Sequence, residues 1–336
     1  MRAMVTGGGG FLGSRIVELL LDAGHDVRFL ARGKYPEVEA RGARGFQIDL
    51  SEGAGLAEAL DGCDVVFHVA AKAGFWGDVA DYRKINVDGT RKLLDACKAA
   101  GVRRFVYTST PSVIGYGADV EGIAEAPYPA SWESPYAETK AEAERLVLAA
   151  NGAEVAGGGR LATVSLRPHL IIGPGDNHLL PRVVQRAKDG KLPRIGNGRN
   201  KVDITYVDNA AFAHLDAAAA LTGPDAKCAG KAYFISNDEP VALWEWLDGF
   251  LGQVGVPPIR RSIGFGTASA VGLLMEIAWS ILPLQGEPRM TRFLAAALAR
   301  AHWYDMGPAK RDLGYSVRVP LAEGTRLTAE WLSTRS

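Results

Sequence analysis

The sequence has little cysteine, no net charge of either sign and no arrangement of metal ligands. Its 336 residues include three cysteines, Cys63, Cys97 and Cys228, which are far apart and form no metal-binding pattern. Such residues are typical of reduced, buried thiols in a cytosolic protein, so we expect neither a disulfide framework nor a metal site. Basic and acidic residues both number 38. The formal charge of zero therefore gives no reason to expect nucleic acid as a partner.

Targeting and modular features are also missing. The chain enters an apolar run and a glycine cluster at once, without the charged region and long apolar core of a secretory signal. We find no internal repeat and no low-complexity linker. With 47% hydrophobic residues, the chain can build one large core or two smaller ones. We expect a globular, cytoplasmic protein.

Short apolar runs alternate with helical patterns through the first half of the chain. The run "DVVFHVA" is apolar on consecutive residues, as in strands that helices cover on both faces. Two helical patterns end at Gly24 and Gly101, which suit helix C-termini. This rhythm predicts an α/β fold with a doubly wound parallel sheet. The six predicted strands are 2–7, 25–31, 43–49, 63–70, 103–109 and 161–168.

The second half is less regular. A region rich in glycine, proline and asparagine leads to a short strand, a helix for which we expect Asp208 as cap, and the strand "KAYFIS". The remaining chain reads mainly as helix, which predicts a smaller substrate lobe and a cleft beside it. We expect the first domain to comprise 1–173 plus 205–236, and the lobe to comprise 174–204 plus 237–336.

The stretch "VTGGGGFLG" follows the first strand and opens the first helix. Its glycines at 7, 10 and 13 permit a tight turn, close approach of backbone N–H groups to a pyrophosphate, and close packing of the helix on the sheet. In this strand–turn–helix context the motif predicts a Rossmann-type dinucleotide site. The residues expected to line it at this stage are Gly7, Gly10, Phe11, Leu12, Gly13, Leu50, Ala70, Ala71 and Lys72.

The end of the second strand bears on the choice of dinucleotide. An NAD site usually has an acidic residue there for the ribose 2′-hydroxyl, but this chain reads "FLARGK". Arg32 can pair with a 2′-phosphate, which favours NADP, although a solvated loop arginine fits the same sequence. Asp49 is a candidate for the adenine end of the cofactor, or alternatively a turn or helix-cap residue.

Tyr136 and Lys140 in "SPYAETK" are four residues apart, so both lie on one helical face. A phenol has a pKa near ~10, and a neighbouring ammonium is expected to lower it, which would make Tyr136 a usable acid and base. Alone, the two residues resemble an ordinary exposed pair. The preceding strand, however, ends in the hydroxyls of "YTSTPSV", at the edge where such sheets bind ligands.

These motifs carry a family resemblance. With "TGGGGFLG", "YTSTPSV", "YAETK" and "RPHLIIGPGDN", the chain resembles the extended short-chain dehydrogenases/reductases. The segments "NGRNKVDITYVDN", "GKAYFISNDEP" and "HWYDMGPAKRDLGY" are similar to the 3β-hydroxysteroid dehydrogenase branch. That branch includes decarboxylating sterol-4-carboxylate dehydrogenases and 2-alkyl-3-oxoalkanoate reductases.

The resemblance implies a catalytic role for three residues. Tyr136 would be the proton donor and acceptor, and Lys140 would tune it and hold the nicotinamide ribose. Thr110 sits where the family has a hydroxyl that binds the substrate oxygen, and Ser109 and Ser112 remain rivals for this role.

Four further residues are expected near the site. Asn86 matches a helix asparagine of the family, with a helix cap as the alternative. Pro168 and His169 would flank the nicotinamide. Lys72 is a candidate for a substrate carboxylate, or alternatively a solvated loop lysine.

The implied activity is NAD(P)-dependent hydride transfer to or from a secondary alcohol or ketone. Both relatives share a β-hydroxy or β-keto acid, so we expect a bulky apolar acid: either 2-alkyl-3-oxoalkanoate reduction or 4-carboxysterol oxidation. One alternative is a nucleotide-sugar epimerase or dehydratase, although Pro111 and Ser112 replace the acidic pair of such dehydratases. Another is a non-catalytic dinucleotide sensor, although such proteins usually lose the tyrosine or the lysine. A homodimer is expected by resemblance.

One long apolar segment, 263–284, has Glu276 as its single charge. Its glycines and Pro283 make it a poor membrane-spanning helix. It fits a buried lobe helix, a lid over the substrate, or a contact with a membrane surface or a partner.

Overall fold

A seven-stranded parallel sheet forms the centre of the protein, in the order β12-β7-β5-β4-β1-β2-β3. The computed structural model describes residues 1–177, 179–223, 226–282 and 284–335. All six strands predicted in the first half are confirmed, and "KAYFIS" supplies the seventh. The strands are β1 (Arg2–Thr6), β2 (Asp26–Ala31), β3 (Arg44–Gln47), β4 (Val65–His68), β5 (Arg104–Thr108), β7 (Ala162–Pro168) and β12 (Lys231–Ile235).

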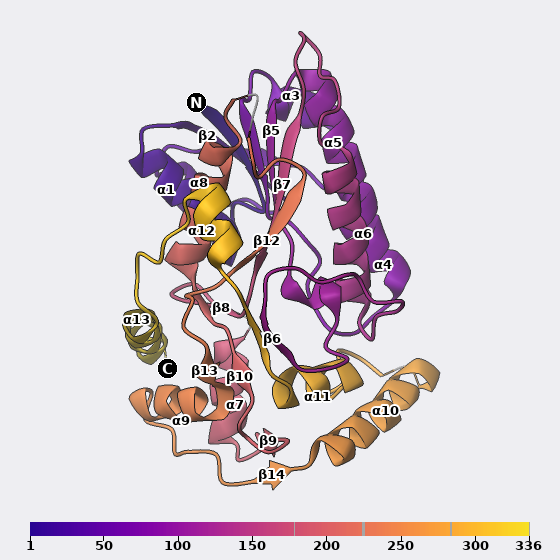
Figure 1. Ribbon diagram of the computed structural model, residues 1–336, viewed down its shortest axis with the longest axis vertical. Coiled ribbons are helices and arrows are strands. Elements are labelled where there is room, and N and C mark those ends of the chain that lie inside the picture. The colour runs from indigo at the N-terminus through magenta and orange to yellow at the C-terminus, as the bar shows by residue number, and fades with distance from the viewer. Residues whose placement is uncertain (178, 224–225, 283, 336) are drawn as a thin grey trace.

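Helices cover both faces of this sheet (Figure 1). Successive residues of β1 belong to different buried clusters: Ala3 and Val5 pack on the face that carries α1 and α8, and Met4 packs on the face that carries α3, α5 and α6. This explains why the strands are apolar at consecutive positions. The helices are α1 (Phe11–Asp22), α8 (Val207–Ala220), α3 (Leu56–Leu60), α5 (Gly89–Ala100) and α6 (Pro135–Ala149). The α2 (Pro36–Glu39), α4 (Val79–Arg83) and η1 (Lys84–Asp88) segments are short.

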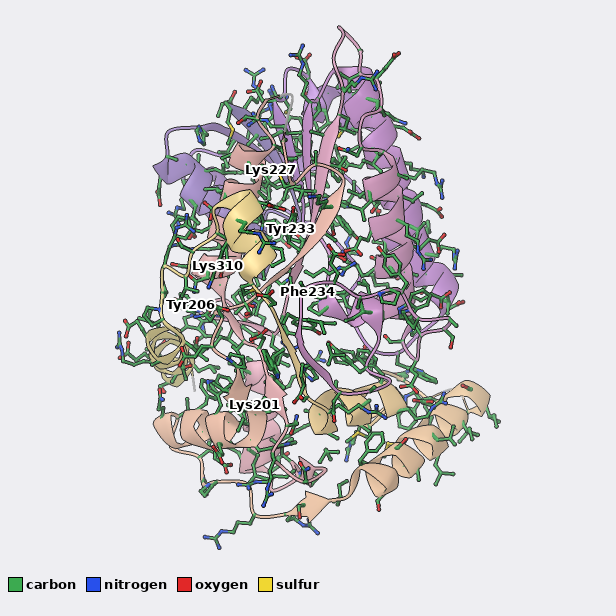
Figure 2. All side chains as sticks on the ribbon, in the orientation of Figure 1. Lys201, Tyr206, Lys227, Tyr233, Phe234 and Lys310 are labelled. Atoms are coloured by element: carbon green, nitrogen blue, oxygen red, sulfur yellow. The ribbon has the colours of Figure 1, made fainter. Side chains whose placement is uncertain are left out.

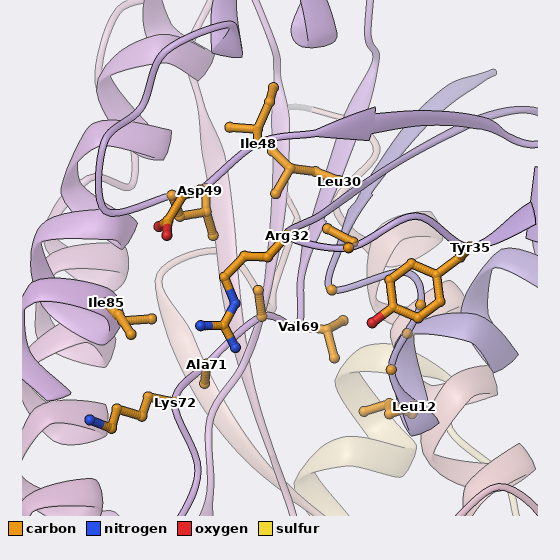
Figure 3. A pocket seen from close by; sticks show the side chains of 18 of the residues that line it. Leu12, Leu30, Arg32, Tyr35, Ile48, Asp49, Val69, Ala71, Lys72 and Ile85 are labelled. Atoms are coloured by element: carbon orange, nitrogen blue, oxygen red, sulfur yellow. The ribbon is translucent and has the colours of Figure 1, made fainter. Parts of the chain in front are cut away.

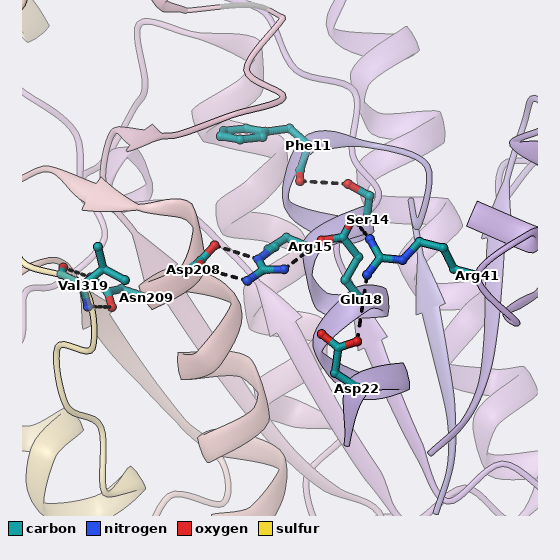
Figure 4. Close-up of polar contacts among 9 residues, drawn as sticks. All are labelled: Phe11, Ser14, Arg15, Glu18, Asp22, Arg41, Asp208, Asn209 and Val319. Carbon is teal, nitrogen blue, oxygen red and sulfur yellow. Dashed lines mark hydrogen bonds and ion pairs between the residues drawn. The ribbon is translucent and has the colours of Figure 1, made fainter. Parts of the chain in front are cut away.

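An ion pair joins the two helices of the first face (Figure 4). Arg15 of α1 donates to both carboxylate oxygens of Asp208, at 2.7 and 2.9 Å. The expected capping role of Asp208 is wrong, because α8 begins at Val207 with Tyr206 as its N-cap residue. The Asp208 carboxylate is engaged by Arg15 instead.

The C-terminal lobe is mainly helical, as predicted. A second, four-stranded sheet has the order β13-β10-β15-β6, and two further strand pairs are β11-β8 and β14-β9. These strands are β13 (Val241–Ala242), β10 (Lys201–Val202), β15 (His302–Tyr304), β6 (Val120–Ile123), β11 (Thr205–Tyr206), β8 (Ile171–Ile172), β14 (Ser262–Ile263) and β9 (Arg194–Ile195). The helices are α7 (Leu180–Lys188), α9 (Leu243–Gln253), α10 (Phe265–Ile281), α11 (Arg292–Ala299) and α13 (Leu321–Ser333).

Two contacts join the two predicted domains. Strand β6, from the first half, pairs in parallel with β15. Helix α12 (Gly307–Leu313) returns to the large sheet, where Figure 2 shows Tyr233 of β12 next to it. The Tyr233 hydroxyl donates to Asp312 of α12 at 2.7 Å. The division into 1–173 plus 205–236 and 174–204 plus 237–336 stays a prediction.

The apolar segment forms a helix that is exposed on one side. Only Ala268, Gly272 and Glu276 of α10 are buried, whereas Leu274 is 66% and Ile281 is 75% exposed. The interpretation as a buried lobe helix is therefore wrong. Position 283 lies outside the described residues. Among the described helices, none is both long enough and apolar enough to cross a bilayer.

Candidate active site

A cavity of about 770 Å³ opens where β1, β2 and β4 end, and the glycine-rich turn forms its base (Figure 3). Most residues expected to contact the dinucleotide line it, from four separate segments of the chain. They are Gly7, Gly10, Phe11, Leu12, Gly13, Arg32, Asp49, Leu50, Ala70, Ala71 and Lys72. The site is thus assembled from the carboxyl edge of the sheet, as the strand order requires.

The glycines leave room that no other residue would leave. Gly7 has a φ of +70°, which favours glycine, and the Gly10 amide donates to the Gly7 carbonyl at 2.9 Å. A Cβ on Gly13 would lie 2.1 Å from the Gly7 oxygen. The turn therefore brings bare backbone to the N-terminus of α1, where an anion is favoured. These residues fit a dinucleotide pyrophosphate.

Arg32 follows β2 and points into this cavity between Asp49 and Tyr35 (Figure 3). A hydrogen bond from the Ser51 amide to Asp49 Oδ1, at 2.8 Å, marks a turn, so the turn interpretation holds alongside the lining position. The hydrogen bonds from Ser51, and then the positive charge of Arg32, lower the pKa of Asp49.

Sequence reasoning missed Tyr35. Its ring lies over Gly9, where an added Cβ would come within 2.4 Å of the ring atoms. An aromatic residue three positions after Arg32, at the same strand end, was the available signal. Tyr35 therefore shapes the same end of the cavity as Arg32.

The loop after β4 is fastened by Asn86. Asn86 Oδ1 accepts from the Lys72 amide at 2.7 Å, and its Nδ2 donates to the Lys72 carbonyl and to Thr139 Oγ1 of α6. The helix-cap alternative is wrong because Asn86 lies inside η1. The Lys72 ammonium lies 3.0 Å from Asp81 Oδ2, so it forms an ion pair. Its role toward a carboxylate stays a prediction.

A second, apolar cavity of about 240 Å³ lies beside the ends of β5 and β7. Five expected site residues line it: Thr110, Ser112, Tyr136, Pro168 and His169. The opposite wall comes from the C-terminal lobe, including Leu180, Leu243, Trp246, Leu247, Phe293 and His302. We call it the apolar cavity. Tyr136 thus faces a pocket whose outer wall is hydrophobic.

Three hydroxyls follow β5, and they differ in position. Thr110 is the N-cap of η2 (Pro111–Ile114), and its Oγ1 lies 3.1 Å from Ser112 Oγ. Thr110 and Ser112 line the apolar cavity together with Tyr136. Ser109 is 4% exposed and is not among the described residues that line the apolar cavity. Thr110 and Ser112, but not Ser109, therefore share the cavity with Tyr136, and the choice of Thr110 stays a prediction.

The electrostatics around Tyr136 differ from the expectation. Burial raises the pKa of Tyr136 to about 12, and the nearby Thr110 hydroxyl opposes this shift. The Lys140 ammonium donates to the Thr108 carbonyl at 2.5 Å and lies 4.1 Å from the centre of the Tyr107 ring. Burial lowers the pKa of Lys140 to about 7. The expected lowering of the Tyr136 pKa is therefore absent in this structure, and Tyr136 is protonated at neutral pH.

A buried ion pair one helical turn beyond Lys140 was not predicted. Arg167 of β7 donates to Glu144 of α6 at 2.6 Å, and the side chains are only 7% and 0% exposed. The hydroxyls of Tyr128 and Ser165 also donate to Glu144, each at 2.7 Å. Glu144 ties α6 to the sheet, because nearly all of its acceptor capacity is used there.

Two imidazoles share a wall of the apolar cavity. The ring centres of His169 and His302 are 4.7 Å apart. His169 Nδ1 donates to the Asp203 carbonyl and His302 Nε2 to the Ala297 carbonyl, which sets both tautomers. Burial lowers the pKa of each ring. Both are neutral near pH 7, and the involvement of His302 was not predicted.

Known proteins resemble this chain along nearly its whole length. Residues 4–263 match the 3-beta hydroxysteroid dehydrogenase/isomerase family. The chain is 48% identical to the 2-alkyl-3-oxoalkanoate reductase of Stenotrophomonas maltophilia (strain K279a), over 97% of this chain and 98% of that protein. It is 32% identical to the decarboxylating sterol-4-alpha-carboxylate 3-dehydrogenase of Mus musculus, over 98% of this chain and 90% of that protein.

A solved structure has the same fold. The structure of MoeE5 in complex with UDP-glucose and NAD is 26% identical and has a TM-score of 0.76, and the match covers 100% of this chain and 99% of that one. The NAD(P) dinucleotide predicted from the glycine turn is typical of this family. The sensor interpretation is wrong, because the relatives are dehydrogenases and reductases that act on CH–OH groups. The chain belongs to the 3-beta hydroxysteroid dehydrogenase/isomerase family of extended short-chain dehydrogenases/reductases and is an oxidoreductase.

Proposed function

We propose that this enzyme reduces 2-alkyl-3-oxoalkanoic acids to 2-alkyl-3-hydroxy acids. One observation carries the proposal: Tyr136 and Thr110 both line an apolar cavity at the carboxyl edge of the sheet, the edge that also forms the dinucleotide cavity. The reductase of Stenotrophomonas maltophilia, at 48% identity, supports the same substrate class.

The proposed chemistry uses the residues in separate roles. A bound nicotinamide dinucleotide supplies the hydride that reduces C3 of the substrate. Thr110 holds the C3 oxygen by a hydrogen bond, and Tyr136 gives that oxygen its phenolic proton, which solvent later replaces. A raised Tyr136 pKa suits reduction, because the acid form is then present at neutral pH. Lys140, one turn along α6, stabilises the phenolate that remains.

The enzyme test uses the reverse reaction, because 2-alkyl-3-hydroxy acids do not decarboxylate as 3-oxo acids do. Purified protein should oxidise these acids with NADP or NAD. Tyr136→Phe should lower kcat by at least ~100-fold, the usual scale of general acid–base catalysis, with unchanged dinucleotide affinity. Turnover of nucleotide sugars or 4-carboxysterols, with none of the hydroxy acids, would reject the proposal. Undiminished turnover in Tyr136→Phe would reject the role of Tyr136.

We also propose that Arg32 gives a preference for NADP over NAD. The guanidinium lies in the dinucleotide cavity, and the end of β2 has no acidic residue. A charge-assisted hydrogen bond to a 2′-phosphate contributes ~1.5–3 kcal/mol, or roughly 10- to 100-fold in affinity. Arg32→Ala should therefore weaken NADP binding by that factor and leave NAD binding unchanged, with the exposed neighbour Lys34→Ala as control. Equal losses for both dinucleotides would contradict the preference.

A further inference from the structure

A second space, a groove bordered by α10, lies next to the apolar cavity. A groove of about 500 Å³ runs between α10, the start of α6 and the loop that precedes α4. It is lined by Trp76, Val79, Trp132, Leu273, Ile277 and Ile281, together with polar residues that include the buried Glu276 and its ion-pair partner Arg292. We call it the α10 groove. Figure 1 shows α10 projecting below α4, with α11 at its side.

Three pairs of consecutive residues separate the two spaces. Phe75, Tyr136 and Phe293 line the apolar cavity, whereas their chain neighbours Trp76, Pro135 and Arg292 line the groove. Phe75 and Phe293 stack with ring centres 5.6 Å apart. The groove therefore meets the cavity at the segment that carries Tyr136.

Each space has a character suited to an alkyl chain. At about 240 Å³ the apolar cavity falls below the ~300–1,000 Å³ of most small-molecule sites, so it holds only part of a bulky substrate. In the groove, Leu273 and Ile277 are 41% and 46% exposed, an apolar surface that a ligand would cover.

The proposed substrate has two chains that diverge next to the reacting carbon. One chain continues from C3, which carries the oxygen, and the other is the alkyl group on C2, one bond away. Two chains that leave from adjacent carbons need two apolar spaces that meet at the proton donor. We propose that the apolar cavity and the α10 groove each hold one of the two alkyl chains of the substrate. This inference rests on the proposed function.

The test separates the two chains. Three acids are oxidised by the enzyme: 2-methyl-3-hydroxybutanoic acid, an analogue lengthened only at C2, and an analogue lengthened only at C3. The readout is the ratio of kcat/KM for each long acid to that for the short acid. Leu273→Trp fills the groove, and Ala297→Leu fills the apolar cavity, which Ala297 also lines. Leu274→Trp is the matched control, because Leu274 lies on the same helix outside the residues that line the groove.

Each filling variant should lower the ratio for one long acid by at least ~10-fold, and the two variants should affect different acids. Equal melting temperatures would show that the variants are folded. The inference is overturned if both variants affect the same acid, or if Leu273→Trp behaves like Leu274→Trp. If wild-type enzyme oxidises none of the acids, the proposed function fails and this inference fails with it. If the enzyme oxidises the acids but the two filling variants do not affect different acids, only this inference fails and the proposed function stands.

Discussion

At the residue scale, Lys140 is a buried amine whose protonation is linked to folding. Burial lowers its pKa from 10.5 to about 7 in the folded chain. Between pH 7 and pH 10.5 the unfolded chain binds a proton at Lys140 that the folded chain does not bind, which favours the unfolded state. The contribution of Lys140 to the unfolding free energy is therefore fully present above about pH 10.5 and is lost as the pH falls toward 7. Below about pH 7, the contribution of Lys140 to the unfolding free energy no longer changes with pH.

We therefore expect Lys140→Met to flatten the dependence of stability on pH. Between pH 7.5 and 9.5, the slope of the unfolding free energy against pH should fall by up to ~1.4 kcal/mol per pH unit relative to wild type. Urea unfolding at several pH values measures this slope. The exposed Lys84→Met is the control and should retain the wild-type slope. Parallel curves for wild type and Lys140→Met would contradict the expectation.

Breaking the buried Glu144–Arg167 ion pair should lower the unfolding free energy more than breaking an exposed ion pair does. Arg167→Met leaves a fully buried carboxylate without its cation, which costs about 3–5 kcal/mol of unfolding free energy. The double variant Glu144→Gln with Arg167→Met should recover part of that loss, because no buried charge remains. Arg326→Met removes an exposed ion pair on α13 and should change stability by no more than ~1 kcal/mol. Similar losses for Arg167→Met and Arg326→Met in urea unfolding would contradict the argument.

At the element scale, α10 depends on one glycine for its contact with α11. A Cβ on Gly272 would lie 2.7 Å from the Thr291 backbone carbon, whereas a Cβ on Gly266 of the same helix meets nothing within 4 Å. Gly272→Ala should therefore destabilise the protein by about 1–3 kcal/mol through overpacking. Gly266→Ala should be neutral or stabilise by up to ~1 kcal/mol. Thermal melting measures both, and equal effects would show that the close approach is unimportant.

The exposed face of α10 explains why the sequence alone allowed several interpretations of this helix. The periodicity of "TASAVGLLMEIAWSIL" shows that the helix is apolar, but apolar residues lie both against α11 and in solvent. Contact with a membrane surface stays a prediction. The groove between α10 and the start of α6 arises from segments about 140 residues apart, so no local pattern could indicate it.

At the scale of the whole molecule, β6 and α12 tie the predicted lobes together. Because these elements make contacts between the two predicted domains, we expect both domains to unfold in one transition. Saturating dinucleotide should raise the midpoint of that whole transition, with ~2.7 kcal/mol of stabilisation at 100 times Kd. Calorimetry with and without NADP checks this. Two transitions of which only one shifts would contradict it and would support independent domains. The expected homodimer stays a prediction.

The sequence alone determined the sheet, the glycine turn and the helix that carries Tyr136 and Lys140. These features are local: strand alternation, a turn that needs glycine, and i, i+4 spacing are all written in neighbouring residues. Tertiary structure alone decided where the charges and cavities lie. Lys140 donates to Thr108 and its pKa is lowered, Glu144 meets Arg167, and His302 joins His169, because each contact joins segments distant in the chain. Burial and partner choice depend on such contacts, and no periodicity specifies them.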